Sequence, residues 1–112
     1  MKDNRHSLEH VLECIVRVER YTAGGKEAFV ADTRTQDAVL RNLQVMAEST
    51  SCLSRDLKAK HPEVNWRTLV AFRNVMVHDY LGIDLTQIWD IVERDVPELK
   101  RQVEAILREL TP

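Results

Sequence analysis

Four side chains that can act on a phosphate group lie within eight residues of one another, and they are Arg73, Asn74, His78 and Tyr80. Arginine binds phosphate oxygens through a planar set of N–H donors, and histidine exchanges protons near neutral pH. The amide of asparagine can orient either group. No cluster of carboxylates or cysteines accompanies these residues in the sequence, so we expect their chemistry to need no metal and no other cofactor.

The segment that carries these residues is predicted to be a helix that begins after Asn65, a good N-cap, and continues to about Tyr80. At about 100° per residue, Arg73 falls in the middle of the apolar face of this helix. A polar stripe beside that face consists of Arg67, Asn74 and His78. An arginine within an apolar face is costly unless it is paired or opens onto a cleft. Its position therefore indicates either an internal ion pair or a functional cleft.

Each of these side chains also has a plainer explanation. Arg73 can form an internal ion pair, for which the candidate carboxylates are Glu19, Glu48 and Glu93. His78 alone is typical of a structural histidine near a helix C-terminus, and Tyr80 alone is typical of a core aromatic with a hydrogen-bonded hydroxyl. The set is more informative than its members, because arginine, asparagine and histidine together favour phosphate chemistry.

The rest of the chain is also predicted to be helical. Apolar residues recur at three- and four-residue steps over residues 7–21, 35–58, 66–80 and 86–110, whereas residues 26–31 are interpreted as a short connection. Thr86 is expected to cap the helix of the fourth stretch, and Asp95 with Pro97 marks either a new helix start or a kink. No stretch alternates with a period of two. The sequence predicts one all-α domain over residues 1–112, an antiparallel bundle of four long helices plus a short helix.

Composition limits the classes of function. The 112 residues include 16 Lys and Arg against 18 Asp and Glu, which gives a net charge of -2. This balance excludes a broad basic surface that coats nucleic acid, although it allows a local basic site. The longest wholly apolar run, residues 69–72, is too short for a membrane span or a signal-peptide core. We therefore expect a cytoplasmic protein that does not enter a membrane.

The string Arg73-Asn74-Val75-Met76-Val77-His78-Asp79-Tyr80 fits an Arg-x-x-x-x-His-x-Tyr pattern. With its surroundings it resembles the HepT-like proteins of the HEPN superfamily of helical ribonucleases. The resemblance extends to the residues before the string (62–66), after it (80–84) and in the C-terminal region (88–99). The Arg–His spacing alone is a weak pattern, but the tyrosine and the flanking aromatic residues make it fairly specific.

The resemblance implies a homodimer in which the motif helices meet and each subunit contributes Arg73 and His78 to one cleft. It also implies metal-independent endoribonuclease activity, in which the RNA 2′-hydroxyl attacks the adjacent phosphorus. His78 would be the general base or acid, and Arg73 would stabilise the charge on the phosphorane. Asn74 would be an accessory catalytic group that orients the phosphate or the imidazole.

The resemblance further implies that the chain is the toxin of a type II toxin–antitoxin system. Its partner would be an MNT-type nucleotidyltransferase antitoxin that neutralises the toxin by adenylylation (AMPylation) of Tyr80. Tyr80 lies two helical turns after Arg73, so a bulky anionic group there would pair with Arg73 and repel RNA. Two copies each of Arg67, Arg73 and His78 near a twofold axis would gather positive charge in an acidic protein. Arg67 is therefore the candidate substrate-binding residue.

Two other functions stay open. Some HEPN-like bundles are non-catalytic, dimeric binding or regulatory subunits of nucleotidyltransferases, and Arg73 and His78 would then be structural or would bind nucleotide. Separately, His6-x-x-Glu9-His10 matches the inverted zinc-peptidase pattern. No third ligand is evident for such a site, so the sequence favours a chance match in a solvated first turn.

Overall fold

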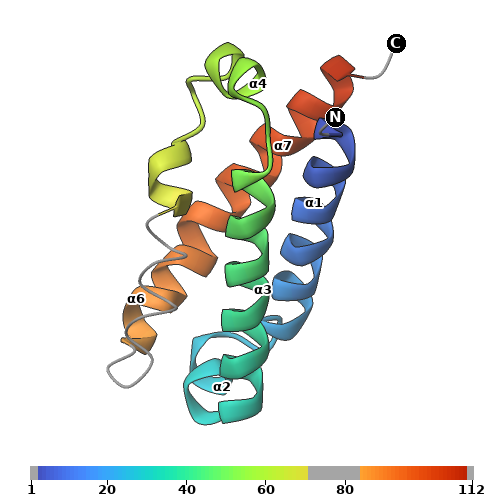
Figure 1. Cartoon of the computed structure of the whole chain (residues 1–112). Helices are drawn as coiled ribbons and strands as arrows, with labels where there is room; N and C mark the ends of the chain where they lie inside the picture. Colours follow the sequence, from blue (N-terminus) through green and yellow to red (C-terminus); the bar gives the residue numbers. More distant parts are fainter. Residues whose placement is uncertain (1–2, 71–83, 111–112) are drawn as a thin grey trace.

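The computed structural model describes residues 3–70 and 84–110, and its elements are helices (Figure 1). In chain order they are α1 (Asn4–Tyr21), α2 (Lys26–Ala31), α3 (Thr33–Ser51), α4 (Arg55–Lys60), α6 (Leu85–Asp90), the π-helical turn η1 (Ile91–Asp95) and α7 (Val96–Leu110). Residues 66–70 are also helical. The described residues contain no strand, which confirms the all-α class for them. Most of the helix predicted at 66–80 lies outside the described residues, so the four-helix bundle and its dimer stay predictions.

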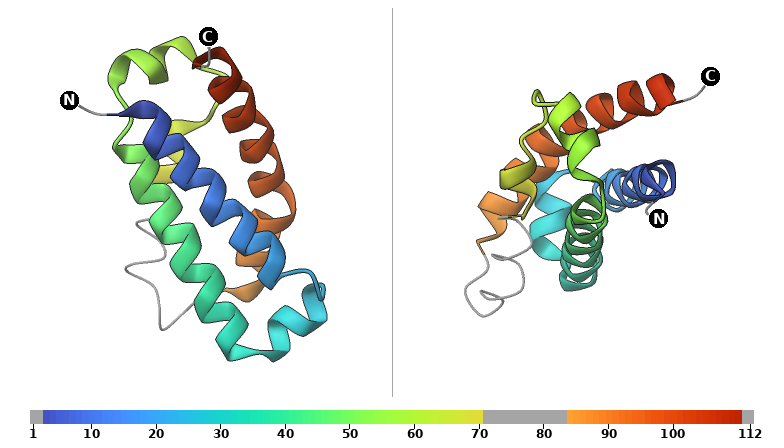
Figure 2. Two further views of the ribbon diagram at one scale, coloured as in Figure 1. Left: turned by 90° about the vertical axis from the view of Figure 1, so that its right-hand side faces the viewer. Right: turned by 45° about the horizontal axis from the view of Figure 1, so that its top comes forward.

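Two long helices, α1 and α3, run side by side in opposite directions (Figures 1 and 2). Their facing stripes are buried and consist of Leu8, Val11, Ile15 and Val18 from α1 with Val39, Leu43 and Met46 from α3. These positions recur at three- and four-residue steps, which places them on one face of each helix. Full burial of a side chain of this size contributes roughly 1.5–3 kcal/mol. The seam between the two helices is therefore a large part of the core.

Aspartates begin both long helices. The Asp3 carboxylate accepts a hydrogen bond from the His6 N–H at 3.2 Å, so α1 starts three residues before the predicted start. At the start of α3, the Asp32 carboxylate accepts from the Arg34 N–H at 3.0 Å and from the Thr35 hydroxyl at 2.9 Å. The Thr35 hydroxyl is the main cause of the lowered pKa of Asp32. Each aspartate satisfies N–H groups that a helix start leaves without partners.

The C-terminal helix α7 packs against α1, and α2 lies at the end of the molecule opposite α4 (Figure 2). Leu99, Val103 and Ile106 of α7 are buried in the same core. At the surface, Lys100 Nζ donates to the Glu19 carboxylate at 3.0 Å and links α7 to α1. Within residues 3–70 and 84–110, no helix combines the length and apolar character that a membrane span requires.

The prediction of one helix over residues 35–58 is wrong, because α3 ends at Ser51 and α4 begins at Arg55. Two hydroxyls in the last turn of α3 bond carbonyls of their own helix, from Thr50 to Ala47 at 2.7 Å and from Ser51 to Glu48 at 2.6 Å. Such bonds compete with the continuation of a helix.

A contact from a distant part of the chain stabilises this break. Ser54 caps α4, since its hydroxyl accepts from the Leu57 N–H at 3.2 Å. The Asn4 side chain donates to that hydroxyl and accepts from the Ser54 N–H, both at 3.0 Å. Leu53 and Leu57 remain buried on either side of Ser54, so the apolar spacing continues through the break without revealing it.

The C-terminal region also differs from two of the expectations. Asp84, rather than Thr86, caps α6, and its carboxylate accepts from the N–H groups of Thr86 (3.0 Å) and Gln87 (3.3 Å). Of the two possibilities at Asp95 and Pro97, the separate helix start is wrong, because η1 joins α6 to α7 and Asp90, Ile91 and Val96 all have α-helical backbone angles. The Val96 N–H donates to the carbonyl of Ile91, five residues back. This wide turn precedes Pro97, whose nitrogen has no hydrogen to donate.

The predicted connection at residues 26–31 is the short helix α2, which adds one aromatic side chain to the core. Phe29 is almost fully buried, and its ring centre lies 5.6 Å from that of Trp89 in α6, with the planes tilted by 39°. This contact packs α2 against the C-terminal helices.

We expect Phe29→Ala to lower the free energy of unfolding by about 3–5 kcal/mol, because it leaves a cavity and removes the Trp89 contact. Val30→Ala is the matched control, since Val30 is its neighbour on α2 and is 45% exposed. The control should lose no more than about 0.5 kcal/mol. Urea unfolding followed by circular dichroism measures both values, and equal losses would contradict the packing described for Phe29.

Candidate functional site

The predicted site residues Arg73, Asn74, His78 and Tyr80 lie outside the described residues. The structure does describe the chain on both sides of them, namely residues 61–70 and the start of α6 at Asp84. It also describes Arg67, the candidate substrate-binding residue, which is exposed as the polar-stripe interpretation predicts.

The turn that leads toward the motif is fixed by a tryptophan. The half-buried Trp66 indole N–H donates to the carbonyl oxygens of Lys58 at 3.2 Å and His61 at 3.1 Å, so one ring closes the turn between α4 and residues 66–70. Asn65 is the predicted N-cap, and its side-chain oxygen accepts from the Thr68 N–H at 3.1 Å. This bond confirms the expected start of the helix.

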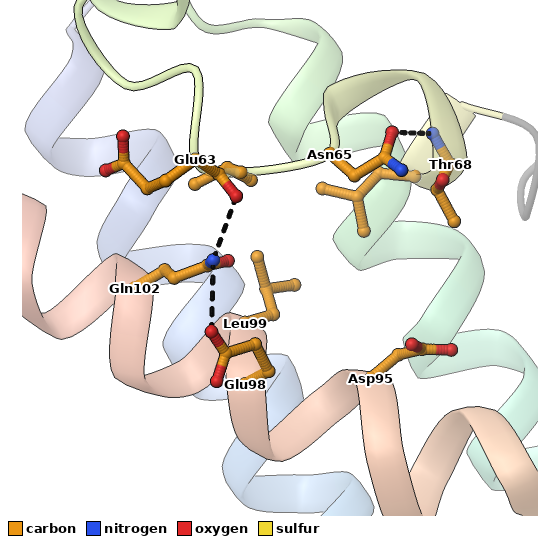
Figure 3. A pocket seen from close by; sticks show the side chains of 9 residues that line it. Glu63, Asn65, Thr68, Asp95, Glu98, Leu99 and Gln102 are labelled. Carbon is orange, nitrogen blue, oxygen red and sulfur yellow. Dashed lines mark hydrogen bonds between the residues drawn. The ribbon is translucent and has the colours of Figure 1, made fainter.

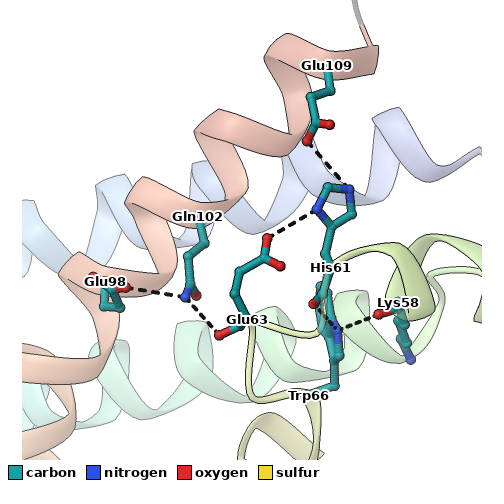
Figure 4. Close-up of polar contacts among 7 residues, drawn as sticks. All are labelled: Lys58, His61, Glu63, Trp66, Glu98, Gln102 and Glu109. Atoms are coloured by element: carbon teal, nitrogen blue, oxygen red, sulfur yellow. Dashed lines mark hydrogen bonds and ion pairs between the residues drawn. The ribbon is translucent and has the colours of Figure 1, made fainter.

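A polar network ties the same turn to α7 (Figure 4). The His61 ring, whose side chain is only 12% exposed, lies 3.2 Å from the Glu63 carboxylate and 3.6 Å from that of Glu109. Gln102 of α7 donates to the Glu63 carbonyl at 3.1 Å. The backbone N–H of Glu63 and then the hydrogen bond to His61 lower the pKa of the Glu63 carboxyl. Residues 61–66 are thus held against two turns of α7.

An open cleft of about 520 Å³ lies beside this turn on the side of α4. Its lining residues are Lys58, Pro62, Glu63, Val64, Asn65, Trp66 and Arg67. Among the residues that the structure describes, neither Lys58 nor Arg67 belongs to an ion pair. The structure therefore places the predicted Arg67 beside a second cation that sequence reasoning missed. The basic composition of residues 55–60 was the available signal, but only the turn brings Lys58 to Arg67.

A smaller hollow of about 240 Å³ lies on the other side of residues 63–65, toward α7 (Figure 3). Its ionisable lining residues are all acidic, namely Glu63, Asp95 and Glu98. Desolvation raises the pKa of Asp95, whereas the hydrogen bond from Arg101 is the main cause of the lowered pKa of Glu98. Residues 63–65 therefore separate a cleft whose lining side chains carry a net positive charge from a hollow whose ionisable side chains are acidic.

Two of the three candidate carboxylates for an ion pair with Arg73 have other partners. Glu19 binds Lys100, and Glu93 accepts from the Trp89 indole N–H at 3.1 Å.

The zinc alternative gains no support either, because His10 Nδ1 lies 2.7 Å from the Ser49 hydroxyl. Over residues 3–70 and 84–110, no three histidine, cysteine or acidic side chains are grouped as a metal site.

A family model described as Ribonuclease HepT-like matches residues 11–106 of this chain. The chain belongs to the HepT-like ribonuclease family. The match includes the motif at 73–80 and all the residues that line the cleft of about 520 Å³. It confirms the resemblance drawn from the motif and supports a ribonuclease function with RNA as the substrate.

Curated relatives of this HepT-like chain carry consistent names. It is 34% identical over 109 residues to "Putative RNase" of Caldanaerobacter subterraneus subsp. tengcongensis, covering 96% of the chain and 97% of the relative. It is 33% identical over 106 residues to "Probable ribonuclease HepT" of Thermococcus cleftensis, with coverage of 94% and 96%. A Methanocaldococcus jannaschii protein named "Gamma-glutamylcyclotransferase and putative RNase" is 32% identical over 110 residues, which are 97% of this chain and 50% of that protein. No solved structure matches the chain.

The Glu63 network predicts a pH-dependent contribution to stability. A carboxyl whose pKa is lowered by folding stabilises the folded state above its ordinary pKa of 4.5, and this contribution is lost as the pH falls through the folded value. Glu63→Gln should therefore unfold at lower urea concentration than the unmodified protein at pH 7. At pH 3, below the ordinary pKa of the Glu63 carboxyl, the difference between the two midpoints should be smaller. A difference of the same size at both pH values would contradict the role given to the charge.

Proposed function

We propose that this HepT-like chain is a metal-independent endoribonuclease and the toxin component of a type II toxin–antitoxin system. The observation that carries the proposal is the family match, because residues 11–106 include the whole Arg73–Tyr80 string. The proposed catalytic residues are Arg73 and His78, with Asn74 as an accessory group. Each of two subunits contributes them to one cleft at the homodimer interface.

The proposed reaction is an internal transfer at phosphorus. His78 takes the proton from the RNA 2′-hydroxyl, the 2′-oxygen bonds to the adjacent phosphorus, and the bond to the 5′-oxygen breaks. His78 of the partner subunit protonates the leaving oxygen, so the products carry a 2′,3′-cyclic phosphate and a 5′-hydroxyl. Such acid–base catalysis contributes roughly 10²–10⁴-fold. Arg73 stabilises the phosphorane charge, a role worth about 3–4 kcal/mol for one preorganised donor.

This chemistry has two requirements, and the described residues bear on the second of them. The nucleophile belongs to the substrate, so the protein needs to supply only proton transfer and positive charge, without activating a water molecule. The catalytic side chains must also be held in place. Trp66 and Asn65 fix the chain before the motif, and Asp84 fixes it after the motif. These contacts support the proposal that residues 73–80 are a positioned site.

Purified protein should cleave RNA in the presence of EDTA at sub-stoichiometric amounts. His78→Ala and Arg73→Ala should each lower kcat/KM by about 10²–10⁴-fold, because each removes a group used in the transition state. His6→Ala is the matched control, since it removes an exposed histidine of the competing zinc pattern and should leave the rate unchanged. Circular dichroism and light scattering check that fold and dimer persist. Full inhibition by EDTA, or full activity of either catalytic variant, would overturn the mechanism.

The proposed antitoxin is an MNT-type nucleotidyltransferase that transfers AMP from ATP to the Tyr80 hydroxyl and releases pyrophosphate. The added phosphate is anionic and bulky. Tyr80 is seven residues after Arg73, a spacing that places both on the same face of a helix. The modification would therefore neutralise Arg73 and exclude RNA phosphates.

Co-expression with the neighbouring nucleotidyltransferase should raise the intact mass of the chain by one or more AMP units. Tyr80→Phe should abolish the increase, because it removes the acceptor oxygen. The chain has one other tyrosine, Tyr21, which is 39% exposed on α1. Tyr21→Phe is therefore the matched control and should still gain the mass. An unchanged mass in the unmodified sequence, or a gain in Tyr80→Phe, would contradict the assignment.

A further inference from the structure

The cleft between α4 and residues 62–67 has the dimensions of a ligand site. Its volume of about 520 Å³ falls within the range of about 300–1,000 Å³ that is common for bound small molecules and nucleotides. It is open to solvent along one side, as a site for a chain-like ligand must be. Its walls come from the half-buried Lys58 on α4 and from the turn that ends at Arg67.

The charges in this cleft are available to a ligand. Two other cations of the described chain are paired with acids, since Lys100 binds Glu19 and Arg101 binds Glu98. Lys58 and Arg67 take part in no such pair within residues 3–70 and 84–110. Two cations in contact with solvent and without acidic partners favour an anionic ligand.

The one acid that lines the cleft is directed elsewhere. The Glu63 carboxylate bonds the His61 ring at 3.2 Å, on the side that faces α7. Figure 4 shows the Lys58 side chain extending away from the Glu63 and Glu109 carboxylates. The positive charge therefore lies on the α4 side of residues 63–65, and the acidic hollow lies on the other side.

The half-buried ring of Trp66 lines the same cleft as the two cations. The two hydrogen bonds from the Trp66 indole N–H prevent the ring from rotating. A fixed aromatic surface flanked by cations is the arrangement that single-stranded nucleic acids use, with phosphates on the cations and a base against the ring. It also reduces the entropy lost on binding.

We propose that this cleft binds the phosphodiester backbone of single-stranded RNA outside the cleavage site, with Lys58 and Arg67 each contacting a phosphate. This inference rests on the proposed ribonuclease function, because Arg67 precedes the catalytic Arg73 by six residues of the same segment. The hollow on the other side of residues 63–65 is lined by acids and by no cation, which favours the α4 side for the strand.

Binding of a labelled 2′-O-methyl oligoribonucleotide tests the proposal, because this RNA lacks the attacking hydroxyl and cannot be cleaved. Fluorescence anisotropy compares the unmodified protein with the Lys58→Gln/Arg67→Gln variant. The control Lys26→Gln/Arg34→Gln removes the same charge at the opposite end of the molecule (Figure 1). Each phosphate contact with single strands contributes about 0.7 to the salt slope. The Kd of the cleft variant should therefore rise about 25-fold at 0.1 M salt, and its slope should fall by about 1.4.

The control should bind within about twofold of the unmodified protein, which is a difference of about 0.4 kcal/mol. Equal weakening in both variants would show a nonspecific charge effect and overturn the cleft. If the double variant fails to fold, Arg67→Gln alone should weaken binding about fivefold, since that side chain is exposed.

In a Trp89→Phe background, Trp66 is the sole tryptophan, and RNA should quench its fluorescence. An unchanged spectrum at saturating RNA would place the strand elsewhere and overturn the proposal.

The same experiment separates failure of the cleft from failure of the proposed function. Cleft-dependent binding without any cleavage of ordinary RNA would support the cleft and contradict catalysis. Cleavage of ordinary RNA by the unmodified protein, with undiminished binding by the Lys58→Gln/Arg67→Gln variant, would contradict the cleft and leave catalysis standing.

Discussion

Burial of apolar side chains between α1 and α3 creates the pair of helices against which α2 and α7 pack. Leu8 and Ile15 face Leu43 and the other α3 residues at full burial, and α7 adds its stripe to the surface that this pair creates. These three helices supply most of the core. The segment that leads to the motif contributes little more than Val64, Trp66 and Leu69. Its other side chains are therefore free to be polar.

Helical periodicity predicts the faces of this fold well and its helix ends less well. The stripes of α1, α3 and α7 and the Asn65 cap all follow from local spacing. The break at Ser54 depends instead on Asn4, a partner fifty residues away in the sequence, and no local pattern reveals it. The π turn is similar, because apolar residues at three- and four-residue steps predict an ordinary α-helix there.

Prediction of the site from the sequence has a comparable limit. The exposure of Arg67 follows from its angle on the helix, but its neighbour Lys58 belongs to another helix and approaches only because the Trp66 indole closes the turn. The chemistry assigned to residues 73–80 rests on residue types, spacing and family membership. The net charge of the whole chain is a poor guide to the charge of a local site for a related reason. Charges act over a Debye length of about 8–10 Å, so a chain with net charge -2 can carry a local cationic cleft and a separate acidic hollow.

The π turn at Ile91–Asp95 has a consequence for how this family can vary in length. A π turn holds one residue more than the α-helical turn that it replaces. Removal of one residue from an ordinary helix would rotate everything beyond it by about 100° and turn the apolar stripe away from the core. Removal of one residue from η1 would restore regular α-helix and keep Ile88 and Leu99 on the buried side. We therefore expect single-residue gaps in alignments of related chains to fall here, within an uninterrupted helix, where gaps are otherwise rare.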